Sequence, residues 1–215
     1  MKKFILPLML LLLAAGFLFA VESDPSEVVG YVKYDCYPGF NFVALPMGDA
    51  ITAEALGQMY SPMVNSIAKW NPVSQIWDTV IYDADFDEWY GSYPVSVGDV
   101  VVMFSSGSFA FYSLGSPVDN QAYTISNGFN HVTVPLNRSD ITSAEGLASS
   151  IGNIASAAVW SNQTQLWETV IYDADFDEWF GSVPLTIGDI AVPYSNGSTV
   201  WPSRFASPVL KATNK

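Results

Sequence analysis

The sequence is poor in cysteine, histidine and basic residues, and each shortage excludes a class of site or partner. Its one cysteine, Cys36, leaves no possibility of an intramolecular disulfide. Its one histidine, His131, lies far along the chain from Cys36, which argues against a thiol nucleophile activated by histidine. Only 8 Lys and Arg accompany 21 Asp and Glu, giving a net charge of −13. Because nucleic acids and anionic membranes are bound through Lys and Arg clusters, we expect cations, neutral sugars or basic proteins instead.

Long apolar runs are also scarce, and the chain has one, from Phe4 to Ala20. It follows Lys2 and Lys3 and ends before the polar residues at Glu22, a layout typical of a secretory signal peptide. We expect residues 1–20 to be the signal peptide, with cleavage after Ala20. An uncleaved anchor is the alternative, because the run approaches the ~20 residues that a membrane helix needs. No second run of that length follows, so we expect an exported protein, secreted or at the cell surface, without a further membrane span.

What the sequence does contain is a duplication. The stretch Thr79–Trp89 returns letter for letter as Thr169–Trp179, and looser similarity extends to both sides. After a flexible lead-in at 21–27, we therefore expect two tandem repeats, at 28–118 and 119–209, followed by a tail at 210–215. Each repeat is near the small end for an independent domain, so the two should pack together.

Most of each repeat has the sequence character of short strands separated by Gly, Ser and Pro turns. Thr79–Asp87 alternates, with Val80, Tyr82, Ala84 and Phe86 on one expected face, which is the period of a half-buried strand. One short helix per repeat is indicated, capped by Thr52 in the first and by a Thr142–Glu145 capping box in the second, with Gly57 and Gly146 interrupting them. The expected fold class is mainly β with a minor α component, each repeat being a small β-barrel or sandwich.

The order of these elements resembles a repeat module of bacterial extracellular proteins. The residues that carry the resemblance are Gly39, Asn41, Pro46, Trp70, Trp77, Gly98 and Asp99, and in the second repeat Gly128, Asn130, Pro135, Trp160, Trp167, Gly188 and Asp189. The resemblance covers nearly the whole chain after the leader. It implies a surface or extracellular module with no assigned catalytic role, and it brings no functional residues.

The duplicated stretch carries a candidate cation site. Asp83, Asp85 and Asp87, repeated as Asp173, Asp175 and Asp177, resemble the start of a calcium loop, and calcium prefers several hard oxygen ligands. A standard loop would need Gly where the chain has Glu88, and a bidentate Glu where it has Pro94. An irregular calcium site therefore remains as one alternative, and a solvated acidic strand face as the other.

Glycan binding is a second candidate function for the same stretch. Tryptophans recur at Trp70, Trp77 and Trp89 and again at Trp160, Trp167 and Trp179. Trp70 and Trp160 are expected in the core, because small β-domains rely on large aromatics for buried area. Trp89 and Trp179, beside Glu88 and Glu178, are expected to be the exposed pair that could stack on a sugar.

Catalysis has less support in the sequence. Asp87 and Glu88 could supply a carboxylate pair for glycoside hydrolysis, but adjacent strand residues point to opposite faces. No nucleophile elbow, zinc-binding helix or phosphate loop motif occurs. We therefore expect a non-enzymatic protein of the bacterial envelope or extracellular matrix that binds a protein or glycan, with self-association as a further possibility.

Overall fold

The computed structural model describes residues 30–116, 118 and 121–202. The expected signal peptide, lead-in and C-terminal tail lie outside these residues. The first half of the described chain comprises β1 (Gly30–Cys36), β2 (Gly39–Ala44), β3 (Ile51–Thr52), α2 (Ala53–Met59), β4 (Val64–Asn71), β5 (Ile76–Asp83), β6 (Glu88–Tyr90), β7 (Pro94–Val95), β8 (Val100–Ser105) and β9 (Phe109–Gly115). The second half comprises β10 (Tyr123–Ile125), β11 (Gly128–Phe129), β12 (Val132–Thr133), α3 (Ala144–Ile151), β13 (Ile154–Ser161), β14 (Leu166–Asp173), β15 (Glu178–Phe180), β16 (Ile190–Ser195) and β17 (Thr199–Trp201).

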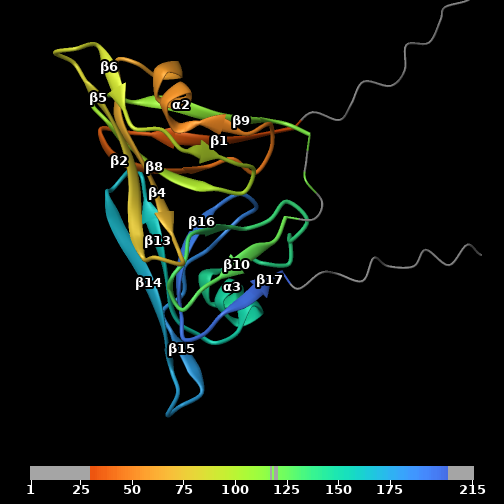
Figure 1. The fold of residues 1–215 in the computed structure, drawn as a ribbon. Coiled ribbons are helices and arrows are strands. Elements are labelled where there is room, and N and C mark those ends of the chain that lie inside the picture. Colours follow the sequence, from red (N-terminus) through yellow and green to blue (C-terminus); the bar gives the residue numbers. More distant parts are fainter. Residues whose placement is uncertain (1–29, 117, 119–120, 203–215) are drawn as a thin grey trace, which may run out of the picture.

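The protein is mainly β, as the sequence predicts, and its strands form open antiparallel sheets (Figure 1). The first sheet has the order β2-β8-β4-β5-β6. The second has the order β11-β16-β13-β14-β15, with β12 also paired to β16. Strand pairs β1-β9, β10-β17 and β3-β7 complete the described strands. Neither large sheet closes into a barrel within this part of the chain, so the sandwich-like alternative is the one adopted.

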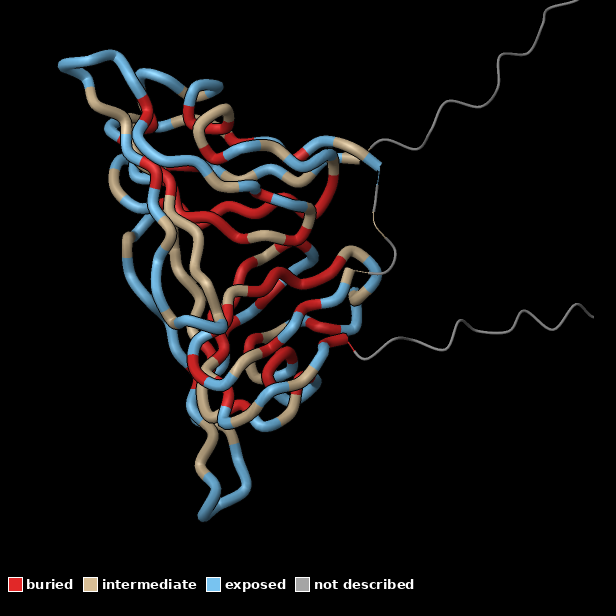
Figure 2. The backbone as a smooth tube through the Cα atoms, viewed as in Figure 1, coloured by how far each residue is buried: buried red, intermediate tan, exposed pale blue. Residues whose placement is uncertain are grey.

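Each half has its own apolar core on one face of its sheet. In the first half, α2 and the β1-β9 pair cover side chains such as Ile67, Val80 and Met103. In the second, α3 and the β10-β17 pair cover a corresponding set that includes Ala157 and Val170. Figure 2 shows these buried segments inside both halves, with exposed hairpins projecting at opposite ends. Burial of such side chains supplies most of the stability of a fold of this size.

The opposite faces of the two sheets meet in a third apolar cluster. It consists of Phe42, Ala44, Val100 and Val102 from the first sheet and Ile190 and Val192 from the second. Strand β2 is consequently buried on both faces at its C-terminal end, which explains why its sequence is continuously apolar there. The expectation that the two halves pack together is thereby met.

Both helices form where expected, but their details differ from the prediction. The Thr52 side chain caps α2 by accepting from the Ala55 backbone N–H at 3.2 Å, as predicted. In α3 the cap is Ser143, one residue after the predicted Thr142, and Glu145 accepts from the Ser182 hydroxyl group instead of closing a capping box. The two glycines lie inside the helices and do not interrupt them. Within the described residues, no helix has the length and apolar character needed to cross a membrane.

The duplicated stretch is a β-hairpin, and the prediction of a continuous strand through Asp87 is wrong. Strand β5 ends at Asp83, residues 84–87 form a turn, and β6 returns from Glu88. Phe86, expected to face inward, is 72% exposed. The turn is favoured because Asp87 adopts a positive φ of 52°, a conformation that Asp tolerates better than most residues.

Candidate functional site

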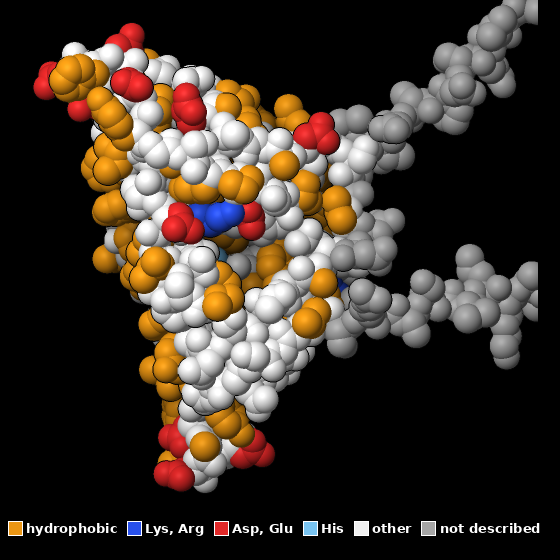
Figure 3. Space-filling model, in the orientation of Figure 1, with side chains coloured by type: hydrophobic (Ala, Val, Ile, Leu, Met, Phe, Trp, Pro, Cys, Tyr) orange, Lys and Arg blue, Asp and Glu red, His pale blue; other side chains and the backbone are white. Residues whose placement is uncertain are grey.

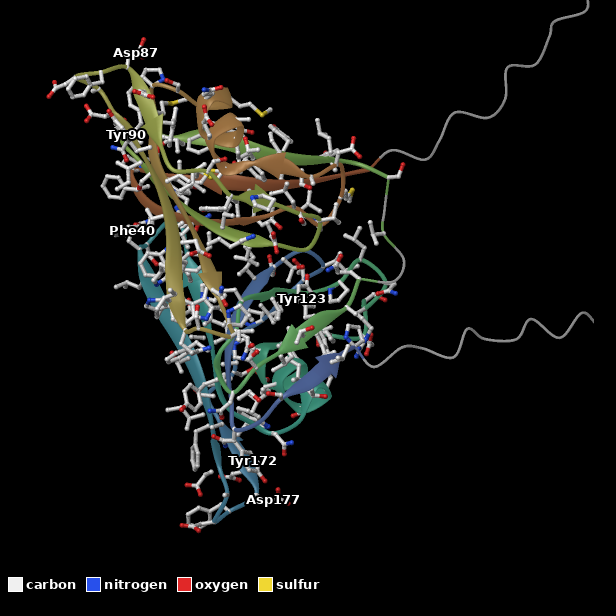
Figure 4. The ribbon with its side chains drawn as sticks, in the orientation of Figure 1. Phe40, Asp87, Tyr90, Tyr123, Tyr172 and Asp177 are labelled. Carbon is white, nitrogen blue, oxygen red and sulfur yellow. The ribbon has the colours of Figure 1, made fainter. Side chains whose placement is uncertain are left out.

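The two acidic stretches are hairpin tips at opposite ends of the molecule. Asp87 at one tip and Asp177 at the other are labelled in Figure 4, far apart across the fold. At the first tip the Tyr82 hydroxyl group donates to Asp87 Oδ1 at 2.5 Å, and Asp83 Oδ1 accepts from the Asp85 N–H at 2.9 Å. The second tip has the same bonds, from Tyr172 to Asp177 and from the Asp175 N–H to Asp173. The aspartate carboxylates at each tip therefore accept hydrogen bonds from their own hairpin and stabilise its turn.

The candidate calcium ligands are not assembled into a metal site. Within residues 30–116, 118 and 121–202, no group of three or more His, Cys, Asp or Glu side chains is placed to hold a metal ion. The three aspartates were expected on one strand face, but the turn at 84–87 removes Asp85 and Asp87 from the strand. Hydrogen bonding to the Asp87 carboxylate raises the pKa of Tyr82, and the equivalent bond raises the pKa of Tyr172.

Trp89 and Trp179 are not the exposed tryptophans, which corrects the sequence prediction. Trp89 is 8% exposed, and its ring packs over Gly57 of α2, where an added Cβ would lie 2.4 Å from Cη2. Trp179 is half-buried against the second core and donates from Nε1 to Ser149 Oγ at 3.1 Å. Glu88 and Glu178 are exposed, so they are separated from the buried or half-buried tryptophans that follow them in sequence.

The exposed tryptophans are Trp77 and Trp167, at 43% and 46%. They belong to a cluster of six rings in which the two halves meet. Phe42 contacts Trp160 and Trp167, His131 contacts Trp70 and Trp77, and the Phe42 and His131 rings touch with centroids 5.6 Å apart. Trp70 and Trp160, expected in the core, are half-buried here and donate from their indole N–H groups to the other half.

The two halves are hydrogen-bonded to each other through two glutamines at corresponding positions. Gln165 bonds both backbone groups of Phe40, accepting from N at 2.7 Å and donating to O at 2.8 Å. Gln75 does the same with Phe129, at 2.8 and 3.0 Å. Gly39 and Gly128 leave the room for these amides, since a Cβ on either would lie 2.4 Å from a glutamine Oε1. The β4-β5 hairpin thus docks on β11, and the β13-β14 hairpin docks on β2.

Starting from Phe40 and Phe129 at these crossings, each sheet exposes an apolar row that crosses its strands. The residues of one row are paired across neighbouring strands: Phe40, Phe104, Ser66, Ile81 and Tyr90. The second sheet pairs Phe129, Tyr194, Ser156, Ile171 and Phe180 in the same way. We call these the outer rows. Figure 3 shows hydrophobic side chains along the left edge of the molecule, between acidic side chains at the two tips, and Phe40 and Tyr90 are labelled on that side in Figure 4.

The outer rows are matched in exposure as well as in position. Ile81 and Ile171 are 55% and 56% exposed, and Tyr90 and Phe180 are 49% and 51% exposed. Phe40 and Phe104 form an edge-to-face ring pair at 5.1 Å, which Phe129 and Tyr194 reproduce at 5.0 Å. The outer rows are not among the sequence predictions, although both halves carry aromatic or branched residues at these positions.

Burial alters the chemistry of two titratable groups near the centre. It lowers the pKa of His131 to about 4, so the imidazole is neutral at physiological pH. It raises the pKa of the Cys36 thiol to about 12, which keeps the sulfur protonated and unreactive. Comparison of the chain with known protein families, curated proteins and solved structures found no match.

Proposed function

We propose that the chain is an exported, non-catalytic binding protein of the cell envelope or extracellular space, which holds a partner on the outer rows of its two sheets. The observation that carries the proposal is the matched pair of outer rows. Contiguous apolar surface that stays exposed on a folded protein typically marks an interaction site. Nearly equal exposure of Ile81 with Ile171, and of Tyr90 with Phe180, is consistent with two equivalent binding surfaces.

Two tandem copies of one module are part of this proposal. Support comes from the identical stretches Thr79–Trp89 and Thr169–Trp179, from the corresponding strand orders of the two sheets, and from the reciprocal bonds of Gln75 and Gln165. Two equivalent surfaces on one chain favour multivalent attachment, in which weak individual contacts combine. The resemblance to bacterial extracellular repeat modules fits this role.

The charge distribution favours a basic protein or peptide as the partner. Each outer row lies next to a tip that carries three aspartates and a glutamate, and the whole chain has a net charge of −13. A partner with an apolar strip bordered by Lys or Arg would complement both features. A second copy of this chain would bring acidic tips against acidic tips, which makes self-association the less favoured arrangement.

A non-catalytic role is supported by how the titratable groups are used. Asp87 and Asp177 accept hydrogen bonds from tyrosines of their own hairpins, His131 packs among aromatic rings, and Cys36 is buried. The carboxylate pair considered for glycoside hydrolysis, Asp87 and Glu88, thus lies at an exposed hairpin tip. General acid–base catalysis needs groups within hydrogen-bond reach of a bound substrate.

The proposal is tested with a labelled synthetic peptide of alternating Phe and Lys, followed by fluorescence anisotropy. Saturable binding is expected, and the double variant Tyr90→Ala, Phe180→Ala should weaken it by about tenfold or more, since aromatic side chains dominate such interfaces. The matched control is Tyr31→Ala, Tyr112→Ala, which removes two rings of the β1-β9 pair that are 65% and 45% exposed.

Equal affinity of the two double variants would refute the outer rows as the binding surface. Absence of saturable binding by the wild-type chain would refute the basic, apolar partner. Concentration-dependent dimers that the Tyr90→Ala, Phe180→Ala change abolishes would assign the surface to self-association instead.

A further inference from the structure

The two places where a hairpin of one half crosses the opposite half are built differently. Where the β13-β14 hairpin meets β2, Asn162 closes the crossing. Its Oδ1 accepts from the Phe42 N–H at 2.8 Å and its Nδ2 donates to the Phe42 carbonyl at 3.1 Å. The Phe42 ring then fills the space beside Trp160 and Trp167. At this crossing a side-chain amide therefore hydrogen-bonds the backbone, and a large aromatic ring fills the space beside it.

The crossing of the β4-β5 hairpin over the second half lacks both features. Pro72 stands at the position that corresponds to Asn162, and its side chain has no hydrogen-bonding group. His131 stands at the position that corresponds to Phe42, with a smaller ring. Two cavities lie here, one of about 400 Å³ and one of about 320 Å³, and both are lined by Trp70 and His131. Substitutions at two equivalent positions therefore coincide with the two cavities at this crossing, the larger of which also reaches Phe42 and Trp167 of the other one.

The two cavities differ in chemistry. The larger is lined almost entirely by rings and aliphatic groups, among them Trp77, Trp167 and Phe129. The smaller has polar walls that include Lys69, Asp99 and Gln121, and Tyr123, which also lines it, is labelled in Figure 4. A ligand that spans Trp70 and His131 would meet an apolar surface on one side and hydrogen-bonding groups on the other.

Neither cavity offers an unpaired charge in the described residues. Lys69 Nζ lies 3.1 Å from Asp99 Oδ2 and donates to the Pro94 carbonyl at 2.6 Å. His131 is neutral, and its Nδ1 is buried without a hydrogen-bond partner. A neutral imidazole has one donor and one acceptor, so this ring retains hydrogen-bonding capacity for a ligand. The strongly acidic chain disfavours an anion. The one carboxylate named in the lining, Asp99, is paired with Lys69 and so gives a cation no free counter-charge.

We propose that this groove, lined by Trp70, Trp77, Trp167 and His131, binds a neutral sugar residue of a glycan. A pyranose ring has an apolar C–H face, which would stack on the exposed Trp77 and Trp167, and a hydroxyl edge, which would bond His131 and the polar cavity. The combined space is in the range typical of small-ligand sites. The groove shares Phe129 with the second outer row, but Trp77 and His131, which the test below changes, are not outer-row residues. The result of that test is therefore independent of the basic partner.

The test is a titration of the full chain with soluble neutral oligosaccharides of the cello-, xylo-, malto- and chito- series, followed by tryptophan fluorescence and ligand-observed NMR. At least one series should give saturable binding. Trp77→Ala should weaken it by about tenfold or more, the loss typical of removing a stacked ring. His131→Phe, which reproduces the ring of the closed crossing, should also abolish binding while the melting temperature stays equal or rises, because it removes a buried unpartnered nitrogen.

The matched control is Phe86→Ala, which removes an exposed aromatic ring from a hairpin tip and should leave saccharide binding unchanged. Lack of binding to every series at millimolar concentrations would overturn the inference. Unaltered binding by His131→Phe would overturn it too, and preferential binding of indole or an organic ammonium ion would assign the groove to another ligand class.

Discussion

The rings of Phe42 and His131 touch at the centre of the molecule, 5.6 Å apart, and occupy corresponding positions in the two halves. Each is held by a tryptophan pair from the opposite half's hairpin: Phe42 by Trp160 and Trp167, and His131 by Trp70 and Trp77. The two halves therefore exchange aromatic contacts and do not simply lie side by side. The exchange is unequal because one half contributes a phenylalanine at this position and the other a histidine.

The glutamine hydrogen bonds between the halves predict that removing either glutamine side chain lowers the stability of the protein. Gln165→Ala removes two hydrogen bonds to Phe40 and should lower the free energy of unfolding by about 1–2 kcal/mol. Gln75→Ala should cost a similar amount. Gln163→Ala, in the same turn but exposed, is the control and should change stability by less than about 0.5 kcal/mol in urea unfolding.

The buried histidine predicts a stability loss in mild acid. Because the folded-state pKa of His131 is lowered from 6.5 to about 4, the unfolded chain takes up its proton first as pH falls. The neutral ring's contribution is present above about pH 6.5 and is lost as pH falls towards 4, amounting to about 2 kcal/mol between pH 7 and 5. Urea unfolding at both pH values should show this loss in the wild-type chain relative to His131→Phe. An identical pH dependence in the two proteins would rule out a neutral, buried imidazole.

The packing of Trp89 over α2 predicts an unequal response of two helix glycines. Gly57→Ala would place a Cβ 2.4 Å from the Trp89 ring and should destabilise the protein by about 1–3 kcal/mol. Gly146→Ala, at the corresponding site of α3, meets only Ser143 Oγ at 3.2 Å and should stay within about 1 kcal/mol of wild type. Thermal unfolding of both variants measures the difference, and equal melting temperatures would contradict the tight contact.

The exposed hairpin tips predict that substitutions of their aromatic residues change stability little, although the alternating sequence pattern suggests that these residues are buried. Phe86→Ala and Phe176→Ala should each change the free energy of unfolding by less than about 0.5 kcal/mol, since the rings are 72% and 73% exposed. Val80→Ala, on the buried face of β5, should cost about 1–3 kcal/mol. A large loss for Phe86→Ala would mean that the tip packs against the body of the protein.

The strands and helices follow from local patterns, and the sequence predicts most of them. The sequence predicts strands at 63–70, 100–104 and 190–194, and β4, β8 and β16 form within a residue or two of these positions. The hairpin tip was missed because the alternation of Val80, Tyr82, Ala84 and Phe86 continues through a turn set by backbone conformation at Asp87. Alternation alone does not distinguish a strand from a strand that ends in such a turn.

The candidate site depended on contacts between the halves, which no local pattern specifies. Trp89 stands next to acidic residues and was expected at the surface, yet Gly57 makes room for it in the core. Trp77 and the outer rows are exposed because the two sheets meet over only part of their outer faces. Which part is covered is set by the docking of Gln75 and Gln165 on the opposite half, and no local sequence pattern indicates that pairing.

The salt dependence of partner binding tests the central claim most directly. If the outer rows and acidic tips together hold a basic, apolar partner, affinity for the Phe-Lys peptide should fall about tenfold or more between 50 mM and 500 mM NaCl, because screening weakens the charge contacts at the tips. The chain with Asp85→Asn, Asp87→Asn, Asp175→Asn and Asp177→Asn should show a much shallower dependence. Affinity that stays constant or rises with salt in the wild-type chain would contradict the account.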